Sequence, residues 1–160
     1  MEEKFPSRVY TYKEVRLAKF LIDNGYRHRL RVIGGKAFKD KVKGALKLIR
    51  TAGYYDLLRT YIKQILEIRG FSQLREAEAS IWANAYTVEN PLEAASFFIQ
   101  KAWQMKRYLE GKLYFGHVGE TEAIDMRIKF LETLRDKSRD QAVKDRCEEL
   151  LKLWDESRLL

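Results

Sequence analysis

The stretch that decides the fold is residues 26–50, which read YRHRLRVIGGKAFKDKVKGALKLIR. Over residues 26–33 the side chains alternate between two faces, which predicts a β-strand. One face carries Arg27, Arg29 and Arg31, and the other carries His28, Leu30 and Val32. The pair Gly34-Gly35 ends this pattern. Over residues 36–51 the apolar side chains recur at helical spacing, which predicts an amphipathic helix directly after the strand.

The same stretch also carries the excess positive charge of the chain. Residues 27–50 contain nine lysines and arginines and one aspartate, which accounts for the whole net charge of +8. Such a concentration of charge predicts attraction to phosphate, nucleic acid or an acidic partner. The alternative is a solvated face that folding neutralises with acidic residues from elsewhere. The anion-binding candidates are Arg27, Arg29, Arg31, Lys36, Lys39, Lys43, Lys47 and Arg50.

Length and composition predict one soluble domain over residues 1–160, because 46% of the residues are hydrophobic and 34% are charged. No apolar run approaches the roughly 20 residues of a membrane helix, so no membrane partner is expected. The N-terminal residues lack the pattern of a secretory signal. The single cysteine excludes an intrachain disulfide and favours a reducing, cytoplasmic location. Asn and Gln are scarce beside Lys, Arg and Glu, a trend of thermophile proteins.

Helix signals lie on both sides of the central stretch. Thr11 and Glu14 form the spacing of a capping box, so we expect a helix to begin there and to end near Asp23. Apolar side chains at helical spacing predict a further helix over residues 57–66, closed by Gly70. Residues 72–88 are ambiguous, because strong helix formers coincide there with an apolar side chain at every second position.

The second half of the chain reads mainly as helix. Asn90-Pro91 predicts a helix start, with an N-cap followed by proline in the first turn, and this helix should end near Glu110. Further helices are predicted over residues 120–135 and from a capping box at residues 138–141 onward. The sequence therefore predicts an α+β, helix-rich single domain with about six helices and a small sheet.

Few residues have the spacing of a known catalytic or metal-binding motif. The chain has two histidines and one cysteine, too few for a zinc site with ordinary ligands. Cys147 lies on the apolar stripe of the last helix, where a thiol is usually a core residue. Backbone N–H groups at Gly34-Gly35 have the position to hold an anion before a helix. An ordinary tight turn explains the same glycine pair.

One resemblance involves residues 100–104, which read QKAWQ, on the helix that follows the strand-like residues 77–87. This order of elements resembles the active-site region of zincin metallopeptidases, whose helix carries His-Glu-x-x-His. The resemblance places Gln100 and Gln104 where the two zinc-binding histidines would be, and Lys101 where the catalytic glutamate would be. Glu122 stands at the third ligand position of the branch that uses a glutamate.

The departures from that motif decide what the resemblance implies. Glutamine is a poor zinc ligand. The resemblance therefore implies a zincin-like domain with no metal, no cofactor and no catalytic residue of that mechanism. Gln100, Lys101, Gln104 and Glu122 are then the remains of an active site. The alternative is that Ser96, Gln100 and Gln104 are only a polar stripe on a partly exposed helix.

Three hypotheses on function follow from the sequence. The first is a non-catalytic zincin-like domain that binds a protein or peptide, for example along an exposed sheet edge. The second is a nucleic-acid or polyanion binder that uses residues 27–50. The third is an enzyme that uses Glu122, Lys101 or His117 in a cleft. The sequence identifies neither the bound species nor the oligomeric state.

Overall fold

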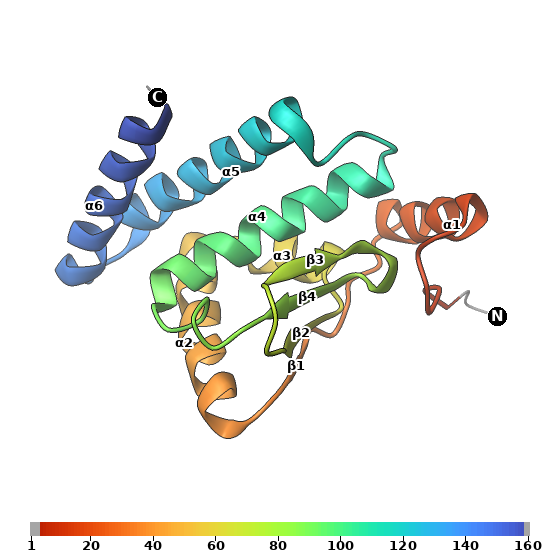
Figure 1. Cartoon of the computed structure of the whole chain (residues 1–160), viewed down its shortest axis with the longest axis horizontal. Coiled ribbons are helices and arrows are strands. Elements are labelled where there is room, and N and C mark those ends of the chain that lie inside the picture. The colour runs from red at the N-terminus through yellow and green to blue at the C-terminus, as the bar shows by residue number, and fades with distance from the viewer. Residues whose placement is uncertain (1–3, 159–160) are drawn as a thin grey trace.

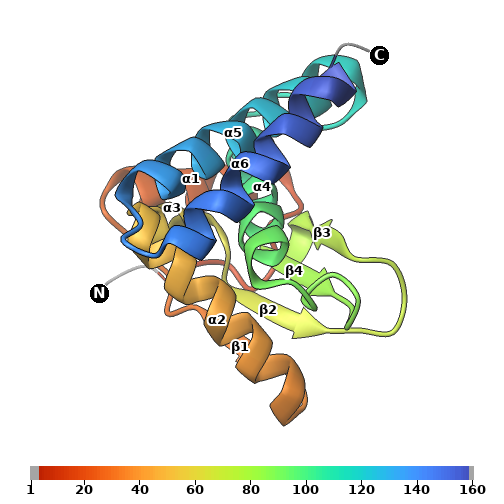
Figure 2. The ribbon, with the colours of Figure 1, turned by 90° about the vertical axis from the view of Figure 1, so that its left-hand side faces the viewer.

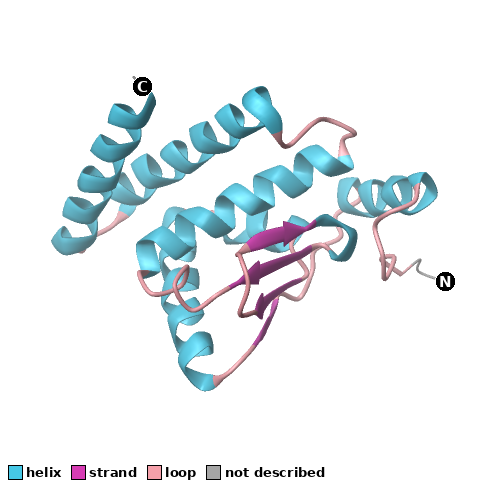
Figure 3. Cartoon of the chain, viewed as in Figure 1, coloured by secondary structure: helices cyan, strands magenta, loops and turns pink. Residues whose placement is uncertain are grey.

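The computed structural model describes residues 4–158 and shows a helix-rich α+β domain (Figures 1 and 3). The described residues form six α-helices, one 3-10 helix and four strands, which confirms the predicted fold class. In chain order the elements are α1 (Tyr12–Asp23), β1 (Arg31–Ile33), α2 (Lys36–Ala52), α3 (Tyr55–Tyr61), β2 (Gln64–Glu67), β3 (Gln73–Arg75), η1 (Glu76–Glu78), β4 (Ser80–Ala83), α4 (Pro91–Leu109), α5 (Gly116–Lys137) and α6 (Gln141–Arg158).

The strands form one sheet in the order β1-β2-β4-β3. β1, β2 and β4 are parallel, and β3 is antiparallel at one edge. One row of paired residues, which contains Val32, Ile65, Ile81 and Leu74, crosses all four strands and faces the core. Because β1, β2 and β4 run the same way, their carboxyl ends meet at a single edge of the sheet.

The helices form layers on one side of this sheet (Figures 1 and 2). α4 contacts β3, α2 and α3, so this helix is central to the domain. α5 packs on α4, and α6 packs mainly on α5, which places α6 far from the sheet. Phe98 and Met105 of α4 and Phe130 of α5 are completely buried in this core.

Two predicted helix starts are confirmed in atomic detail. The Thr11 side chain accepts a hydrogen bond from the Glu14 backbone N–H, and the Glu14 carboxylate accepts one from the Thr11 N–H. Asn90 caps α4 by accepting hydrogen bonds from the N–H groups of Leu92 and Glu93. The predicted capping box at residues 138–141 is wrong, because Asp140 accepts from the Ala142 N–H while Ser138 ends α5.

The predicted helix over residues 57–66 is correct for residues 57–61 and wrong for the residues after them. α3 ends at Tyr61, and the chain continues as β2 from Gln64 to Glu67. The apolar spacing fits both structures, but Ile65 lies between Val32 of β1 and Ile81 of β4 and is completely buried. Pairing with strands on both sides outweighs the local helical pattern, and β-branched side chains suit such a site.

The predicted strand over residues 26–33 is shorter than expected, since only residues 31–33 form β1. The alternation nevertheless continues before it: Arg27, Arg29 and Arg31 are exposed, whereas His28 is buried. Residues 72–88 contain no α-helix. They form a hairpin in which β3 and β4 are joined by η1, and Ala79 takes a positive φ of 50° at the turn.

His28 is buried on the core side, with 2% of its surface exposed. Its ring contacts the rings of Phe5 and Tyr26 at centroid distances of 4.5 and 5.1 Å, and Nε2 has no hydrogen-bond partner. Burial, helped by the charge of Lys63, lowers the pKa of His28 from 6.5 to about 4. The folded chain therefore holds this imidazole neutral where an unfolded chain would protonate it.

This difference predicts a loss of stability in acid. Between pH of about 6.5 and about 4 the unfolded state binds more protons at His28, so stability is full above this window and decreases as pH falls through it. We expect His28 to account for a loss of about 3 kcal/mol in the free energy of unfolding near the lower limit. Urea denaturation across this range should show a smaller pH dependence for His28→Phe. Equal pH dependence in the two proteins would contradict the assignment.

Candidate functional site

Most of the predicted anion-binding residues are exposed in the structure, on or next to the neighbouring elements β1 and α2. Six of them have exposed side chains and take part in no ion pair within residues 4–158. This set, called the basic surface below, is Arg29, Arg31, Lys36, Lys39, Lys43 and Lys47. Acidic helices therefore do not neutralise it through direct contacts, which was the alternative reading of its charge.

The basic surface is built from two neighbouring elements. β1 and the residues before it place Arg29 and Arg31 on the face of the edge strand that points away from the core. α2 packs beside β1, as Figure 2 shows, and turns its apolar side inward. Its lysines recur at spacings of three and four residues on the opposite side, so they form one stripe along the helix.

The remaining cations of residues 27–50 have local partners. The Arg27 guanidinium donates to the Tyr26 carbonyl at 2.7 Å, and the Arg50 guanidinium lies 4.2 Å from the centre of the Tyr55 ring. Lys41 forms an ion pair with Glu89, in the segment that precedes α4. Arg27 and Arg50 thus have partners within the protein and are less available to a ligand.

The Gly34-Gly35 turn, at the start of α2, contacts the carboxylate of Glu67. The backbone N–H of Gly35 donates to Oε1 of Glu67 at 2.9 Å. A side chain at position 34 would collide with this arrangement, because its Cβ would lie 2.8 Å from Cβ of Glu67 and 2.7 Å from Cδ1 of Phe38. The anion that binds at this turn is therefore the Glu67 carboxylate. Glycine at position 34 permits the close approach of Glu67, because it has no Cβ.

Glu67 should contribute to stability through this contact. Glu67→Ala removes the acceptor and a negative charge near the N-terminus of α2, so we expect the free energy of unfolding to fall by about 1 kcal/mol. Thermal or chemical denaturation measures the change. Glu132→Ala, at an exposed position of α5, is the matched control and should have little effect. Equal stability of Glu67→Ala and the wild type would refute this role.

Gln100 lies in a polar cluster between α4 and α5. Arg127 of α5 donates from Nε to the Ser96 hydroxyl at 2.9 Å and from Nη1 to Oε1 of Gln100 at 2.8 Å. Its guanidinium also lies 4.9 Å from the centre of the Trp154 ring, on α6. Burial lowers the pKa of Arg127 to about 10, so the group remains charged at neutral pH. One side chain thereby joins three helices.

The other residues that the resemblance assigns to a former active site, Lys101, Gln104 and Glu122, have partners different from those of Gln100. Gln104 donates from Nε2 to the Tyr114 carbonyl at 3.2 Å, and Glu122 forms an ion pair with Arg107. The Lys101 ammonium lies 5.1 Å from the centre of the Phe97 ring, and burial together with the charge of Arg127 lowers its pKa. His117 is exposed at the start of α5.

These contacts do not fit a zinc site. Zinc would require the side chains of Gln100, Gln104 and Glu122 to meet, yet each has its own protein partner, and the Arg127 cation already contacts Gln100. Among the described residues, no group of three or more His, Cys, Asp or Glu side chains is placed to hold a metal ion. Gln100 is bonded to a residue of α5, and Gln104 is bonded to the segment that joins α4 to α5.

Cys147 is completely buried on α6, and burial raises the pKa of its thiol to about 11. A thiol with such a pKa carries almost no thiolate at neutral pH, which is the form that a nucleophile requires. Its position agrees with the sequence interpretation of a small core residue.

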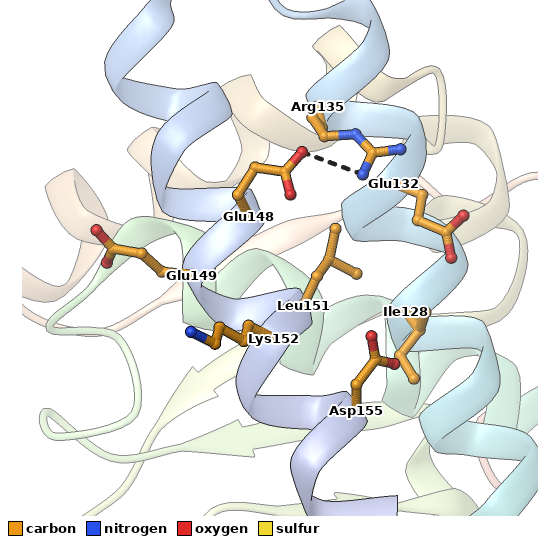
Figure 4. A pocket seen from close by; sticks show the side chains of 8 residues that line it. All are labelled: Ile128, Glu132, Arg135, Glu148, Glu149, Leu151, Lys152 and Asp155. Atoms are coloured by element: carbon orange, nitrogen blue, oxygen red, sulfur yellow. Dashed lines mark hydrogen bonds and ion pairs between the residues drawn. The ribbon is translucent and has the colours of Figure 1, made fainter.

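A hollow of about 510 Å³ lies between α5 and α6 (Figure 4). Arg135 and Glu148 point toward each other across it at 3.2 Å, and Ile128 and Leu151 supply apolar surface. Four carboxylates and two cations line the hollow, so its charge is opposite to that of the basic surface. The residues that line this hollow do not indicate a particular class of ligand.

Comparisons of the chain with models of protein families, with curated proteins and with solved structures find no match. Within residues 4–158, no helix has both the length and the apolar character needed to cross a membrane. Sequence reasoning missed Glu67 and Arg127, because their partners lie 27 to 32 residues away along the chain. Nothing near either residue marks it as a contact between elements.

Proposed function

We propose that this domain binds polyanions through the basic surface, with nucleic acid as the principal class of ligand. The observation that supports the proposal is the set of six exposed cations on α2, on β1 and just before β1, which form no ion pair with any residue that the structure describes. The rest of the chain is neutral in sum, so the net attraction to a polyanion comes from residues 27–50. Lysines and arginines on such a surface contact phosphates and release counterions on binding.

Binding of a nucleic acid tests this proposal directly. A short fluorescein-labelled oligothymidylate should bind at low salt, with a fluorescence anisotropy that rises with protein concentration. The apparent affinity should fall steeply as salt is added, since phosphate contacts are screened and counterion release becomes less favourable. The proposal fails if no binding occurs at low salt, or if the affinity does not depend on salt.

A second candidate is the non-catalytic zincin-like domain that binds a peptide. The observation in its favour is β3, which runs antiparallel at the edge of the sheet and contacts α4. Gln100 and Gln104 lie one turn apart on α4, and Glu122 lies on the helix packed against it. An extended peptide can add to such an edge through backbone hydrogen bonds.

Metal analysis tests this second candidate. Protein purified without chelator should contain no stoichiometric zinc, because glutamine and a neighbouring arginine disfavour the metal. Zinc at one equivalent would refute the non-catalytic reading. Replacing Gln73 in β3 by proline should weaken the binding of any peptide that adds to this edge, because proline cannot donate a backbone hydrogen bond.

A further inference from the structure

Two fully exposed aromatic side chains lie at the carboxyl ends of the central strands. Phe71 and Tyr86 each have 90% of their surface exposed. Phe71 belongs to the segment between β2 and β3, and Tyr86 belongs to the segment between β4 and α4. Because β2 and β4 are parallel neighbours, these segments leave the sheet at the same edge. Large apolar groups exposed together on a soluble domain often mark a binding site.

Hydrogen bonds hold the two segments against each other. The Asn84 side chain donates to the Gly70 carbonyl at 3.0 Å and accepts from the Thr87 N–H at 2.8 Å. The Ser72 hydroxyl accepts from the Asn84 N–H at 2.9 Å and bonds to the Thr87 hydroxyl at 2.5 Å. The segments that carry Phe71 and Tyr86 are therefore fixed relative to one another, so binding there would require little ordering of the chain.

A hollow of about 620 Å³ lies between these segments. Tyr86, Asn84, Ile68 and Arg69 line it, together with Glu67 and Ala85. Its wall thus offers an aromatic ring, apolar surface and an exposed guanidinium. A ring of this kind can stack on a nucleobase, and a guanidinium can bond to the edge of a base. The Asn84 amide is already bonded to Gly70 and Thr87, and the Glu67 carboxylate is bonded to Gly35.

The hollow adjoins the basic surface through Glu67. The carboxylate of this residue, which lines the hollow, accepts a hydrogen bond from Gly35 at the start of α2. Lys36, an exposed member of the basic surface, is the next residue along the chain. Lys41 of α2 also pairs with Glu89, which follows Tyr86 in the same segment. A strand with its phosphates on α2 would therefore pass close to the aromatic side chains.

We infer that the hollow with Phe71 and Tyr86, called the aromatic edge, binds unpaired bases of a single-stranded nucleic acid. This inference rests on the proposed function and specifies its ligand. The basic surface holds the phosphates, and the aromatic edge stacks on the bases. A duplex keeps its bases inside the helix, so it reaches only the basic surface.

An abasic oligonucleotide of the same length separates the two contributions, because it has the phosphates without the bases. The wild type should bind labelled oligothymidylate about tenfold more tightly than the abasic strand. Phe71→Ala/Tyr86→Ala should remove most of this difference and leave abasic binding unchanged. The control Tyr12→Ala/Phe20→Ala, which removes two exposed aromatic side chains of α1, should bind both strands as the wild type does.

Each other outcome has a definite meaning. Equal affinity of the wild type for the two strands overturns the aromatic edge and leaves phosphate binding intact. Unchanged oligothymidylate binding by Phe71→Ala/Tyr86→Ala also overturns it. Duplex binding as tight as single-strand binding shows that unpaired bases add nothing, which overturns it too. If the wild type binds neither strand at low salt, the proposed function itself fails.

Discussion

Replacing Arg29, Lys39, Lys43 and Lys47 by glutamine should weaken oligothymidylate binding about 100-fold at low salt, because each lost phosphate contact forgoes the release of condensed counterions. All four side chains are exposed, so their replacement should leave the core unchanged. Fluorescence anisotropy measures the affinity, and circular dichroism shows whether the fold is retained.

A variant with the same loss of charge elsewhere provides the control. Four exposed cations are suitable: Lys13 on α1, Lys129 on α5, Arg139 between α5 and α6, and Lys152 on α6. Their replacement by glutamine lowers the net charge equally, but we expect the affinity to fall only a few-fold through the weaker long-range attraction. Equal losses in the two variants would show that net charge alone governs binding, and the basic surface would lose its special role.

Arg127→Ala should lower the free energy of unfolding by about 3 kcal/mol. The substitution leaves the Ser96 hydroxyl and Oε1 of Gln100 without their donor in the α4–α5 interface. It also removes the contact with Trp154, which is one of several contacts between α5 and α6. Urea denaturation followed by circular dichroism measures the loss.

Lys129→Ala is the matched control for this prediction, since Lys129 is two residues away on the same helix and is exposed. It should change the free energy of unfolding by less than about 0.5 kcal/mol. Arg127→Lys should lose part of the stability, because lysine retains the charge without the two-pronged geometry of a guanidinium. A loss for Arg127→Ala no larger than that for Lys129→Ala would show that the cluster does not hold the helices together.

Local sequence patterns predicted those elements whose buried and exposed sides are marked by the spacing of their own residues. Alternation around Arg29 predicted which of its neighbours are exposed, and helical spacing in residues 36–51 predicted α2 and its exposed side. The N-caps at Thr11 and Asn90 were equally clear, because each is formed by neighbours in the chain. Residues 57–66 misled because the same apolar spacing fits a helix and a buried strand, and only the pairing of Ile65 decides between them.

The proposed binding surfaces were harder to predict, because they depend on contacts between residues that are distant in the sequence. The charge of the basic surface was visible from composition. Only the folded arrangement shows that its members form no ion pair among residues 4–158. Phe71 and Tyr86 gave no signal, because exposed and buried aromatic residues look alike in a single sequence. Gln100 and Gln104 attracted attention by their spacing, whereas Arg127, which explains the contacts of Gln100, did not.

The salt dependence of oligothymidylate binding tests the central claim most directly. If all six cations of the basic surface contact phosphates, log K should fall against log salt with a slope of about −4. With Arg29, Lys39, Lys43 and Lys47 replaced by glutamine, two of these cations remain, and the slope should be about −1.4. The control variant with four distant cations replaced should keep the slope of the wild type. The same slope in all three proteins would contradict binding through the basic surface.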